Sequence, residues 1–221
     1  MKKYLLLAFM AISIGIIPSK TYAVDIAIGP TTWYVWSSEG GDVDPGFLFG
    51  PALSVKLNDT YNLTFVYLYG KFTATKDDGT HYKIKRYDSD LALNYRLNNY
   101  FKVFGGLKYF GYKDTNAEVD FDGYGPGLGL SFTYNIVENL FALATLSGFA
   151  LYSTEESVNS GKDHYISCGY NSTLGLAYYI ARESVAVNIG WRSQYFVYDF
   201  DNTEMFYGLT IMATYSFNAD L

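Results

Sequence analysis

Apolar and polar residues alternate along most of the chain with a period of two. Residues 206–217, FYGLTIMATYSF, place Tyr207, Leu209 and Ile211 on one face and small or mostly polar residues on the other. Such alternation is typical of a β-strand with one apolar and one wet face. The pattern predicts ten strands, at 24–37, 46–57, 61–73, 82–97, 101–113, 121–136, 140–153, 164–181, 184–198 and 205–217. No segment of the mature chain has a convincing helical period, so the predicted fold class is all-β.

Two kinds of connection alternate between these segments. Brief connections follow every second strand, and longer polar connections follow the others. Turn length fixes which residues face each other in a hairpin. Where the register is clear, the brief turns bring apolar residues opposite apolar residues: Leu57 with Tyr61, Leu97 with Phe101, and Ile180 with Val185. The connections therefore support an antiparallel sheet of consecutive hairpins.

The N-terminal segment does not fit this pattern. MKKYLLLAFMAISIGIIPSKTYA has two lysines, an apolar run and small residues near its end, which predicts a secretory signal peptide at 1–23. A barrel domain is then expected at 24–221. The alternative is a membrane anchor helix, but the apolar run is short for a full span.

The predicted sheet has one apolar face and one charged face. In a soluble β-sandwich the apolar face would be the core, whereas in a membrane barrel it faces lipid. Aromatic residues near strand ends, among them Tyr61, Tyr69 and Trp191, suit the interfacial girdles of a barrel. A bilayer tolerates no open sheet edge, so the ten strands are predicted to close. We therefore favour a closed antiparallel transmembrane β-barrel over the sandwich.

Composition agrees with a sheet that has one wet face. The 221 residues are 49% hydrophobic and 17% charged, with a mean hydropathy of +0.01. A net charge of −6 excludes the basic footprint of a nucleic-acid-binding protein. The single Cys168 excludes a disulfide scaffold, and its parity with Ile166 places it against lipid.

This pattern resembles the small bacterial outer-membrane β-barrels of the OmpA/OmpX type over the whole mature chain. The resemblance implies the bacterial outer membrane, with short turns in the periplasm and longer loops outside the cell. The implied partners are outer-membrane lipid and lipopolysaccharide, the barrel-assembly machinery, and an extracellular partner of unknown identity. In this class the last strand carries an assembly signal, here Tyr207, Gly208, Tyr215 and Phe217, although NADL follows Phe217.

Charged residues on the inward face carry both signs. A barrel of ~8 strands is filled by its own side chains, and aqueous channels appear at ~16 strands. Buried opposite charges are expected to pair, because a lone buried charge is costly. The sequence therefore predicts a network that plugs the lumen, formed by Asp88, Asp90, Arg96, Lys102, Lys108 and Arg192. The alternative is a narrow solute pathway, or a small-solute binder, lined by the same residues.

A run of four glycines on the inward face leaves space along one wall of the lumen. These residues are Gly123, Gly125, Gly127 and Gly129. We favour the interpretation that large residues across the barrel, such as Phe110 or Tyr198, fill the space. The alternative is a lumen groove that holds a ligand.

Candidate catalytic residues do not form a consistent set. Resemblance to the outer-membrane proteases (omptins) would require an Asp pair and an Asp–His pair, for which Asp88, Asp90, Asp163 and His164 are the candidates. Adjacent strand residues point to opposite faces, so Asp163 and His164 do not share a cleft unless the loop reorients them. Ser167 lies three residues after His164, which is the wrong spacing for a lipid A deacylase. We therefore predict no enzyme, with an outer-membrane hydrolase as the second alternative.

The longer connections are acidic, which we attribute to solvation. No metal or other cofactor is predicted, and Asp199, Asp201 and Glu204 are only weak candidates for Ca²⁺. A divalent ion that bridges these acids to lipid phosphates is a variant of this hypothesis, since the sequence shows no basic stripe to bind phosphates directly. The sequence thus predicts a non-enzymatic barrel that supports the envelope or presents loops for interaction.

Overall fold

The computed structural model describes residues 23–38, 42–75, 79–114, 119–157, 161–198 and 202–220. Apart from Ala23, the predicted signal peptide lies outside these residues and stays a prediction. The long strands are β1 (Ala23–Ser37), β3 (Gly46–Lys56), β4 (Tyr61–Thr75), β5 (His81–Arg96), β6 (Phe101–Asp114), β7 (Val119–Val137), β8 (Leu140–Ser157), β9 (Gly161–Ile180), β10 (Val185–Val197) and β11 (Thr203–Asp220). The described chain also holds a short strand β2 (Asp42–Val43) and a 3₁₀ turn η1 (Ala181–Glu183). No helix in these residues is long and apolar enough to cross a membrane.

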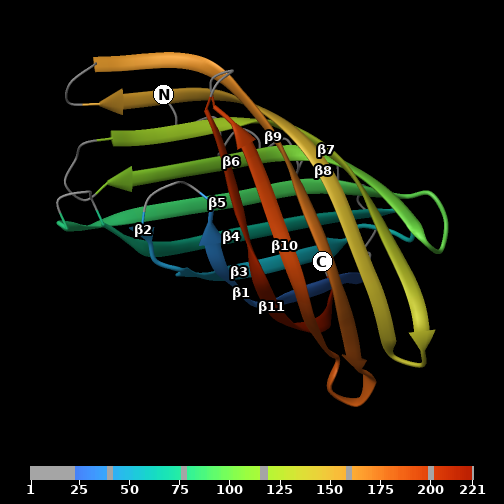
Figure 1. The fold of residues 1–221 in the computed structure, drawn as a ribbon. Helices are drawn as coiled ribbons and strands as arrows, with labels where there is room; N and C mark the ends of the chain where they lie inside the picture. The colour runs from blue at the N-terminus through green and yellow to red at the C-terminus, as the bar shows by residue number, and fades with distance from the viewer. Residues whose placement is uncertain are drawn as a thin grey trace.

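The sheet closes on itself. Each long strand pairs antiparallel with its neighbours in the order β4-β3-β1-β11-β10-β9-β8-β7-β6-β5, and a further pairing of β4 with β5 completes the circuit (Figure 1). β1 and β11 form the seam, with Ala23 opposite Asp220 and Ser37 opposite Phe206. The predicted closed antiparallel barrel is therefore confirmed, and the sandwich is excluded.

The short turns set the register that the sequence predicts. The Leu57 and Leu97 amides donate to the carbonyls of Tyr61 and Phe101 at 3.0 Å, and Val185 lies opposite Ile180. In the first two turns an asparagine side chain accepts from the backbone amides two and three residues later, at 2.8 and 2.9 Å. These side chains replace the ladder hydrogen bonds that the turning backbone lacks.

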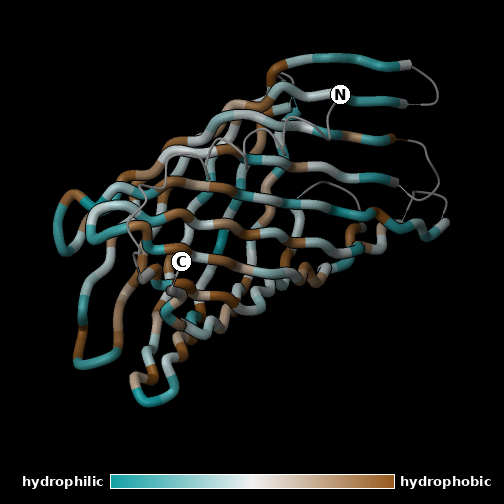
Figure 2. The backbone as a smooth tube through the Cα atoms, turned by 180° about the vertical axis from the view of Figure 1, so that it is seen from behind, coloured by the Kyte–Doolittle hydropathy of each residue, from teal (hydrophilic) through white to brown (hydrophobic). Residues whose placement is uncertain are grey.

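The strands on the side of the longer connections extend beyond their predicted ends. β8 continues to Ser157 and β9 begins at Gly161, so the expected loop at 154–163 is largely a hairpin. Figure 2 shows hydrophilic residues dominating these projecting ends. Where a strand projects beyond the rest of the sheet, both of its faces meet water, so the apolar–polar alternation that marks strands elsewhere is lost there.

The barrel is apolar outside and filled with side chains inside. Leu128, Ile166 and Leu174 are 73%, 67% and 67% exposed on the outer face. Inside, Trp33, Leu48, Phe110, Leu151 and Phe196 are completely buried. This inside-out arrangement matches a sheet that meets acyl chains rather than water.

Aromatic residues mark both edges of the outer apolar band. On β4 the residues Tyr61 and Tyr69 stand eight positions apart, as do Tyr95 and Tyr87 on β5. At a rise of ~3.3 Å per residue and a strand tilt of ~40°, that separation covers about 20 Å along the membrane normal, close to the apolar band of such barrels. Tyr61 packs on Tyr95 and Tyr69 on Tyr87, with ring centroids 5.4 and 5.2 Å apart.

Candidate functional site

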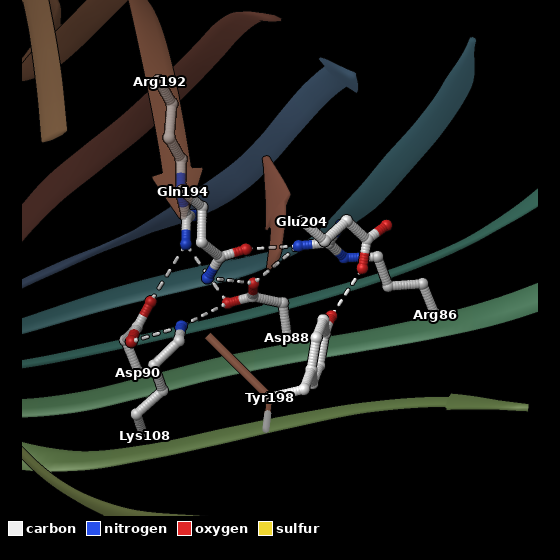
Figure 3. Close-up of polar contacts among 8 residues, drawn as sticks. All are labelled: Arg86, Asp88, Asp90, Lys108, Arg192, Gln194, Tyr198 and Glu204. Atoms are coloured by element: carbon white, nitrogen blue, oxygen red, sulfur yellow. Dashed lines mark hydrogen bonds and ion pairs between the residues drawn. The ribbon is translucent and has the colours of Figure 1, made fainter. Parts of the chain in front are cut away.

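A cluster of charged side chains lies in the middle of the lumen (Figure 3). Asp88 on β5 accepts hydrogen bonds from Lys108 Nζ on β6 at 3.1 Å and from Arg192 Nη2 on β10 at 3.2 Å. Asp90, two residues further along β5, contacts the same two cations at 3.1 and 3.3 Å. Asp88 is 1% exposed, so its charge is compensated by protein groups rather than by water.

Arg86 and Gln194 complete the cluster on its other side. Gln194 Nε2 donates to Asp88 Oδ2 at 2.9 Å, and Arg86 Nη2 lies 3.4 Å from the same oxygen. Arg86 also donates to Gln194 Oε1. Its guanidinium carbon lies 3.5 Å from the ring centroid of Phe206 and 4.8 Å from that of Phe110. The aromatic faces offset part of the cost of removing this cation from water.

This cluster spans the full width of the barrel. Because the circuit contains ten long strands, β5 and β10 lie five strands apart in either direction. The contacts of Asp88 with Arg192 and Gln194 therefore join opposite walls. We call the set Arg86, Asp88, Asp90, Lys108, Arg192 and Gln194 the central network.

Glu204 on β11 lies beside the central network on the side of the longer loops. It accepts hydrogen bonds from Ser37 Oγ at 3.1 Å and from the Tyr198 hydroxyl at 2.5 Å. Counted with Glu204, the three cations and two aspartates of the central network make an electrically neutral group. Charge balance of this kind is what buried ionic clusters require.

An aromatic layer follows the central network toward the longer loops. Phe110 and Phe196 pack with ring centroids 4.2 Å apart, and Phe149 adjoins them from the side of the short turns, 5.0 Å from Phe196. Phe121 stacks on Tyr112 at 5.2 Å. These rings come from β6, β7, β8 and β10, so they also meet across the lumen.

The structure brings four of the six residues of the predicted charge network together. Asp88, Asp90, Lys108 and Arg192 meet, whereas Arg96 and Lys102 do not join them. Arg96 is exposed at a short turn, where it donates to Asn99 Oδ1 at 2.7 Å. Lys102 sits near the same end of the barrel and forms no ion pair with the described residues.

The central network has two members that the predicted network lacks. Arg86 and Gln194 share inward parity with Asp88 and Arg192, two residues away on the same strands. That parity was the signal that could have found them.

The four glycines of β7 face inward as predicted, and most of the space beside them is filled, although the nearest atoms belong to adjacent strands and not to Phe110 or Tyr198. A Cβ atom on Gly125 would lie 2.0 Å from the Ala150 carbonyl oxygen, and one on Gly129 would lie 2.2 Å from the Phe104 ring. A Cβ on Gly123 would meet Leu151 and Ser153 at 3.1 Å. Only at Gly127 are the nearest atoms at ordinary contact distance, 3.5 Å or more away. The glycine wall is thus mainly a place of close backbone approach.

Gly127 lines a cavity of about 390 Å³ on the side of the short turns. Hydroxyl and amide side chains dominate its polar lining, with Asp90, Lys108 and Arg192 at the inner end: Thr31, Thr64, Asn94, Ser131, Thr145, Ser147, Asn171, Thr173, Asn188 and Thr210. The buried Oδ1 atom of Asn171 has no hydrogen-bond partner. We call this space the lower vestibule.

A second cavity of about 270 Å³ lies on the side of the longer loops. Its lining includes Phe72, Arg86, Phe110, Glu155 and Glu204. The two cavities share no lining residue. Members of the central network line both, which places the network between them.

The candidate catalytic residues are separated by the barrel wall. His164 points outward, where its Nδ1 lies 3.1 Å from Thr154 Oγ1 and its ring stacks on Tyr152 at 5.7 Å. Ser167 is completely buried inside, and its hydroxyl lies 2.5 Å from that of Ser153. Asp88 and Asp90 face the lumen, so His164 shares no cleft with them.

The weak metal candidates remain untested as a set. Asp199 and Asp201 lie outside the described residues, and Glu204 is bound to Ser37 and Tyr198. The described part of the chain contains no group of three or more His, Cys, Asp or Glu placed to hold a metal ion.

The proposed assembly signal lies on β11, which forms the seam with β1. Tyr215 and Phe217 stack on its outer face at 6.1 Å, and Tyr207 stacks on Trp36 and Trp191 at 6.2 and 6.0 Å. Its role in assembly stays a prediction. Cys168 is exposed on the outer face, as its parity predicts.

The structure is similar to a solved translocator domain over almost its whole length. The translocator domain of the autotransporter NalP from Neisseria meningitidis has a TM-score of 0.51 and 13% identity, with 98% of this chain and 96% of that chain covered. The fold is that of a bacterial outer-membrane β-barrel. Outer-membrane location is consistent with these neighbours.

Two further neighbours have lower scores. Neisserial surface protein A has a TM-score of 0.46 and 13% identity over 88% of this chain and 97% of its own. The outer membrane protease OmpT from Escherichia coli has a TM-score of 0.46 and 12% identity over 91% and 99%. No protein-family model and no curated protein matches the sequence. Similarity at this level of sequence identity shows the fold alone. The role of the protein has to be inferred from the residues of this chain.

Proposed function

We propose that this protein is a non-enzymatic outer-membrane barrel whose lumen is closed by its own side chains. It supports the envelope and interacts through the loops and outer surface that it presents. The observation that carries the proposal is the central network, which joins β5 to β10 across the lumen through Asp88 and Arg192. A solute that crosses the barrel would have to break these contacts and pass the aromatic layer.

Energetics favour a permanently closed state. Removing one partner of a buried ion pair typically costs ~3–5 kcal/mol, because the other charge is left uncompensated. Asp88 has three cations around it, so opening a path between them would strand several charges at once. The network resembles a structural plug more than a lining that solutes displace.

Conductance in a planar bilayer tests the closed lumen. We expect the wild-type barrel to give no discrete current steps at any voltage, and the Arg192→Ala/Phe110→Ala variant to give steps, because it removes one cross-lumen contact and one ring. Steps of constant size from the wild type would overturn the proposal. Heat-modifiable migration on gels verifies that both proteins are folded.

The placement of the candidate catalytic groups supports the non-enzymatic part of the proposal. His164 faces outward, while Ser167, Asp88 and Asp90 face inward and are engaged with other side chains. A general base must reach its proton through a hydrogen bond or one water, which the wall prevents here. Peptide or lipid hydrolysis by the folded protein that is abolished by His164→Ala would contradict this part.

The lower vestibule supports a second candidate function, the binding of a small polar solute. Its volume of about 390 Å³ is within the range of small-molecule sites, and its lining presents many hydroxyl and amide groups. The unpartnered Asn171 Oδ1 offers an acceptor. Calorimetric titration with neutral sugars tests this candidate, with Gly127→Leu as a variant that fills the vestibule, and no heat from any sugar would remove it.

A further inference from the structure

The register of β4, β5 and β6 builds a row of lysines that the sequence does not reveal. Lys71 on β4 lies opposite Lys85 on β5, and Lys85 lies opposite Lys113 on β6. Lys83 stands two residues further along β5, opposite Thr73. All four share the parity of the outward aromatic residues. We call this set the lysine patch, and it corrects the expectation that the chain has no basic stripe.

The lysine patch begins where the apolar band ends. Lys71 follows Tyr69 by two residues and Lys85 precedes Tyr87 by two, so both lie on the side of the tyrosines toward the longer loops. Tyrosines of this kind sit at the level of the lipid headgroups. Two further residues at ~3.3 Å each carry the lysines just beyond the tyrosine rings, to the level of headgroup phosphates.

Neighbouring lysines in this arrangement repel each other. Like charges directly opposite in an antiparallel pair destabilise the sheet. Lys71, Lys83 and Lys85 form no ion pair with any described residue, and Lys113 pairs with Asp120 at the edge of the patch. A protein with net charge −6 thus gathers unneutralised cations on one part of its outer surface. An external anion would relieve the repulsion.

The neighbouring wall has the opposite charge. On β7 Asp122 accepts a hydrogen bond from the Tyr109 hydroxyl at 2.5 Å, and on β8 Glu156 lies 3.9 Å from Lys162 of β9. Among the described residues, lysines without an ion pair therefore stand over β4 and β5, while Glu156 on the neighbouring wall is offset by Lys162. An anionic ligand is better accommodated over β4 and β5 than beside Asp122.

We propose that the lysine patch binds the phosphate groups of lipopolysaccharide in the outer leaflet. The acyl chains of the lipid lie against the apolar outer face of β4–β6, and its phosphates meet Lys71, Lys83 and Lys85. A ligand with more than one phosphate suits the patch, because adjacent strands hold the lysines ~4.8 Å apart and one phosphate does not neutralise three ammonium groups. Lys113 contributes at the edge.

Binding of purified lipid A by the full barrel in neutral-detergent micelles tests this proposal. Each lysine near an anionic lipid surface contributes about fivefold in affinity, so the Lys71→Gln/Lys83→Gln/Lys85→Gln variant is expected to bind about a hundredfold more weakly. The matched control is Lys56→Gln/Lys102→Gln/Lys162→Gln, which removes the same charge elsewhere and is expected to bind like the wild type. Heat-modifiable migration verifies that all three proteins are folded.

Two competing ligands identify the source of the phosphate. Lipid A from which the phosphates have been removed is expected to bind as weakly to the wild type as intact lipid A binds to the patch variant. Phosphatidylglycerol is expected to bind at least tenfold more weakly than lipid A, since it carries a single phosphate. Equal loss in the control variant, equal binding of dephosphorylated lipid A, or equal binding of phosphatidylglycerol would each overturn the proposal.

The inference depends on the outer-membrane placement with the longer loops outside, and not on a closed lumen. Current steps in the bilayer experiment would remove the plug and leave the lysine patch unaffected. Conversely, a failure to bind lipid A would leave the conductance result unchanged.

Discussion

Asp88 and Arg192 are in contact at 3.2 Å although their strands lie on opposite sides of the barrel. The two residues are far apart within the sheet. Their contact therefore depends on the diameter of the lumen and on the stagger of the strands. Lys108, Arg86 and Gln194 meet at the same carboxylate. The interior is therefore tied together by one acidic side chain, which suggests where the fold is most sensitive to substitution.

Replacing that carboxylate is expected to destabilise the barrel strongly. Asp88→Asn keeps the shape and removes the charge, which leaves the buried Arg86 and Lys108 and the largely buried Arg192 without their shared partner. This change should lower the free energy of unfolding by ~3 kcal/mol or more. Urea unfolding in phospholipid vesicles measures the change. The control is Asp59→Asn, which breaks the exposed Lys56–Asp59 pair at 2.9 Å and should leave the midpoint unchanged. Equal midpoints for the two variants would show that the network carries little stability.

Two glycines on the same face of β7 should respond differently to alanine. A Cβ at Gly125 would lie 2.0 Å from a backbone oxygen, which cannot move without opening the β7–β8 ladder, whereas the nearest atom at Gly127 is 3.5 Å away. We expect Gly125→Ala to lower the free energy of unfolding by ~2 kcal/mol or more and Gly127→Ala to leave it unchanged. Unfolding midpoints and the yield of folded barrel measure both. Equal tolerance would mean that the β7 wall is looser than its geometry indicates.

The three tryptophans provide a test of the inside-out arrangement. Trp33 is completely buried in the lumen, while Trp191 is 43% exposed on the outer face and stacks on Trp36 at 5.9 Å. In vesicles of brominated phosphatidylcholine, Trp33→Phe/Trp36→Phe should keep strong quenching, because Trp191 touches lipid. Trp36→Phe/Trp191→Phe should be quenched far less. The reverse order would place the apolar face inside.

The contact between Lys56 and Asp59 at the first short turn should change how the Asp59 carboxyl titrates. Lys56 donates a hydrogen bond to Asp59 and thereby lowers the pKa of this carboxyl from its ordinary value. A lowered pKa in the folded state means that the pair contributes stability above the ordinary pKa of aspartate and loses it as the pH falls through the lowered value. NMR titration of the Asp59 side chain should show its pKa rising in Lys56→Gln. An unchanged pKa would show that the contact is not formed in solution.

The sequence predicted the wall of the barrel because the wall is built from local signals. Period-two alternation marked each strand, and the asparagine turns at 58–60 and 98–100 fixed the register across them. Closure followed from the physics of a bilayer. The predicted length of the β8–β9 hairpin is too short, because a strand that meets water on both faces shows no apolar–polar alternation.

The interior was only partly predictable. The alternation along a strand tells which residues point inward, but it does not tell their positions along the barrel axis. The height at which opposite walls meet depends on the stagger of the closed sheet. For this reason the predicted network includes Arg96 and Lys102, which lie nearer the short turns than Asp88. For the same reason it lacks Arg86 and Gln194. The lysine patch was invisible for the same reason, since register alone makes Lys71 and Lys113 neighbours across β5.

The seam between β1 and β11 gives the buried charges a role during biogenesis. Until the first and last strands meet, the face that bears Asp88 and Arg192 has no opposite wall, and a partly assembled sheet would turn these ions toward acyl chains. Entry of such a sheet into the bilayer would be costly for each exposed ion, so we expect insertion to follow completion of the ring. The ionic core would then act as a checkpoint that only a full set of strands can pass.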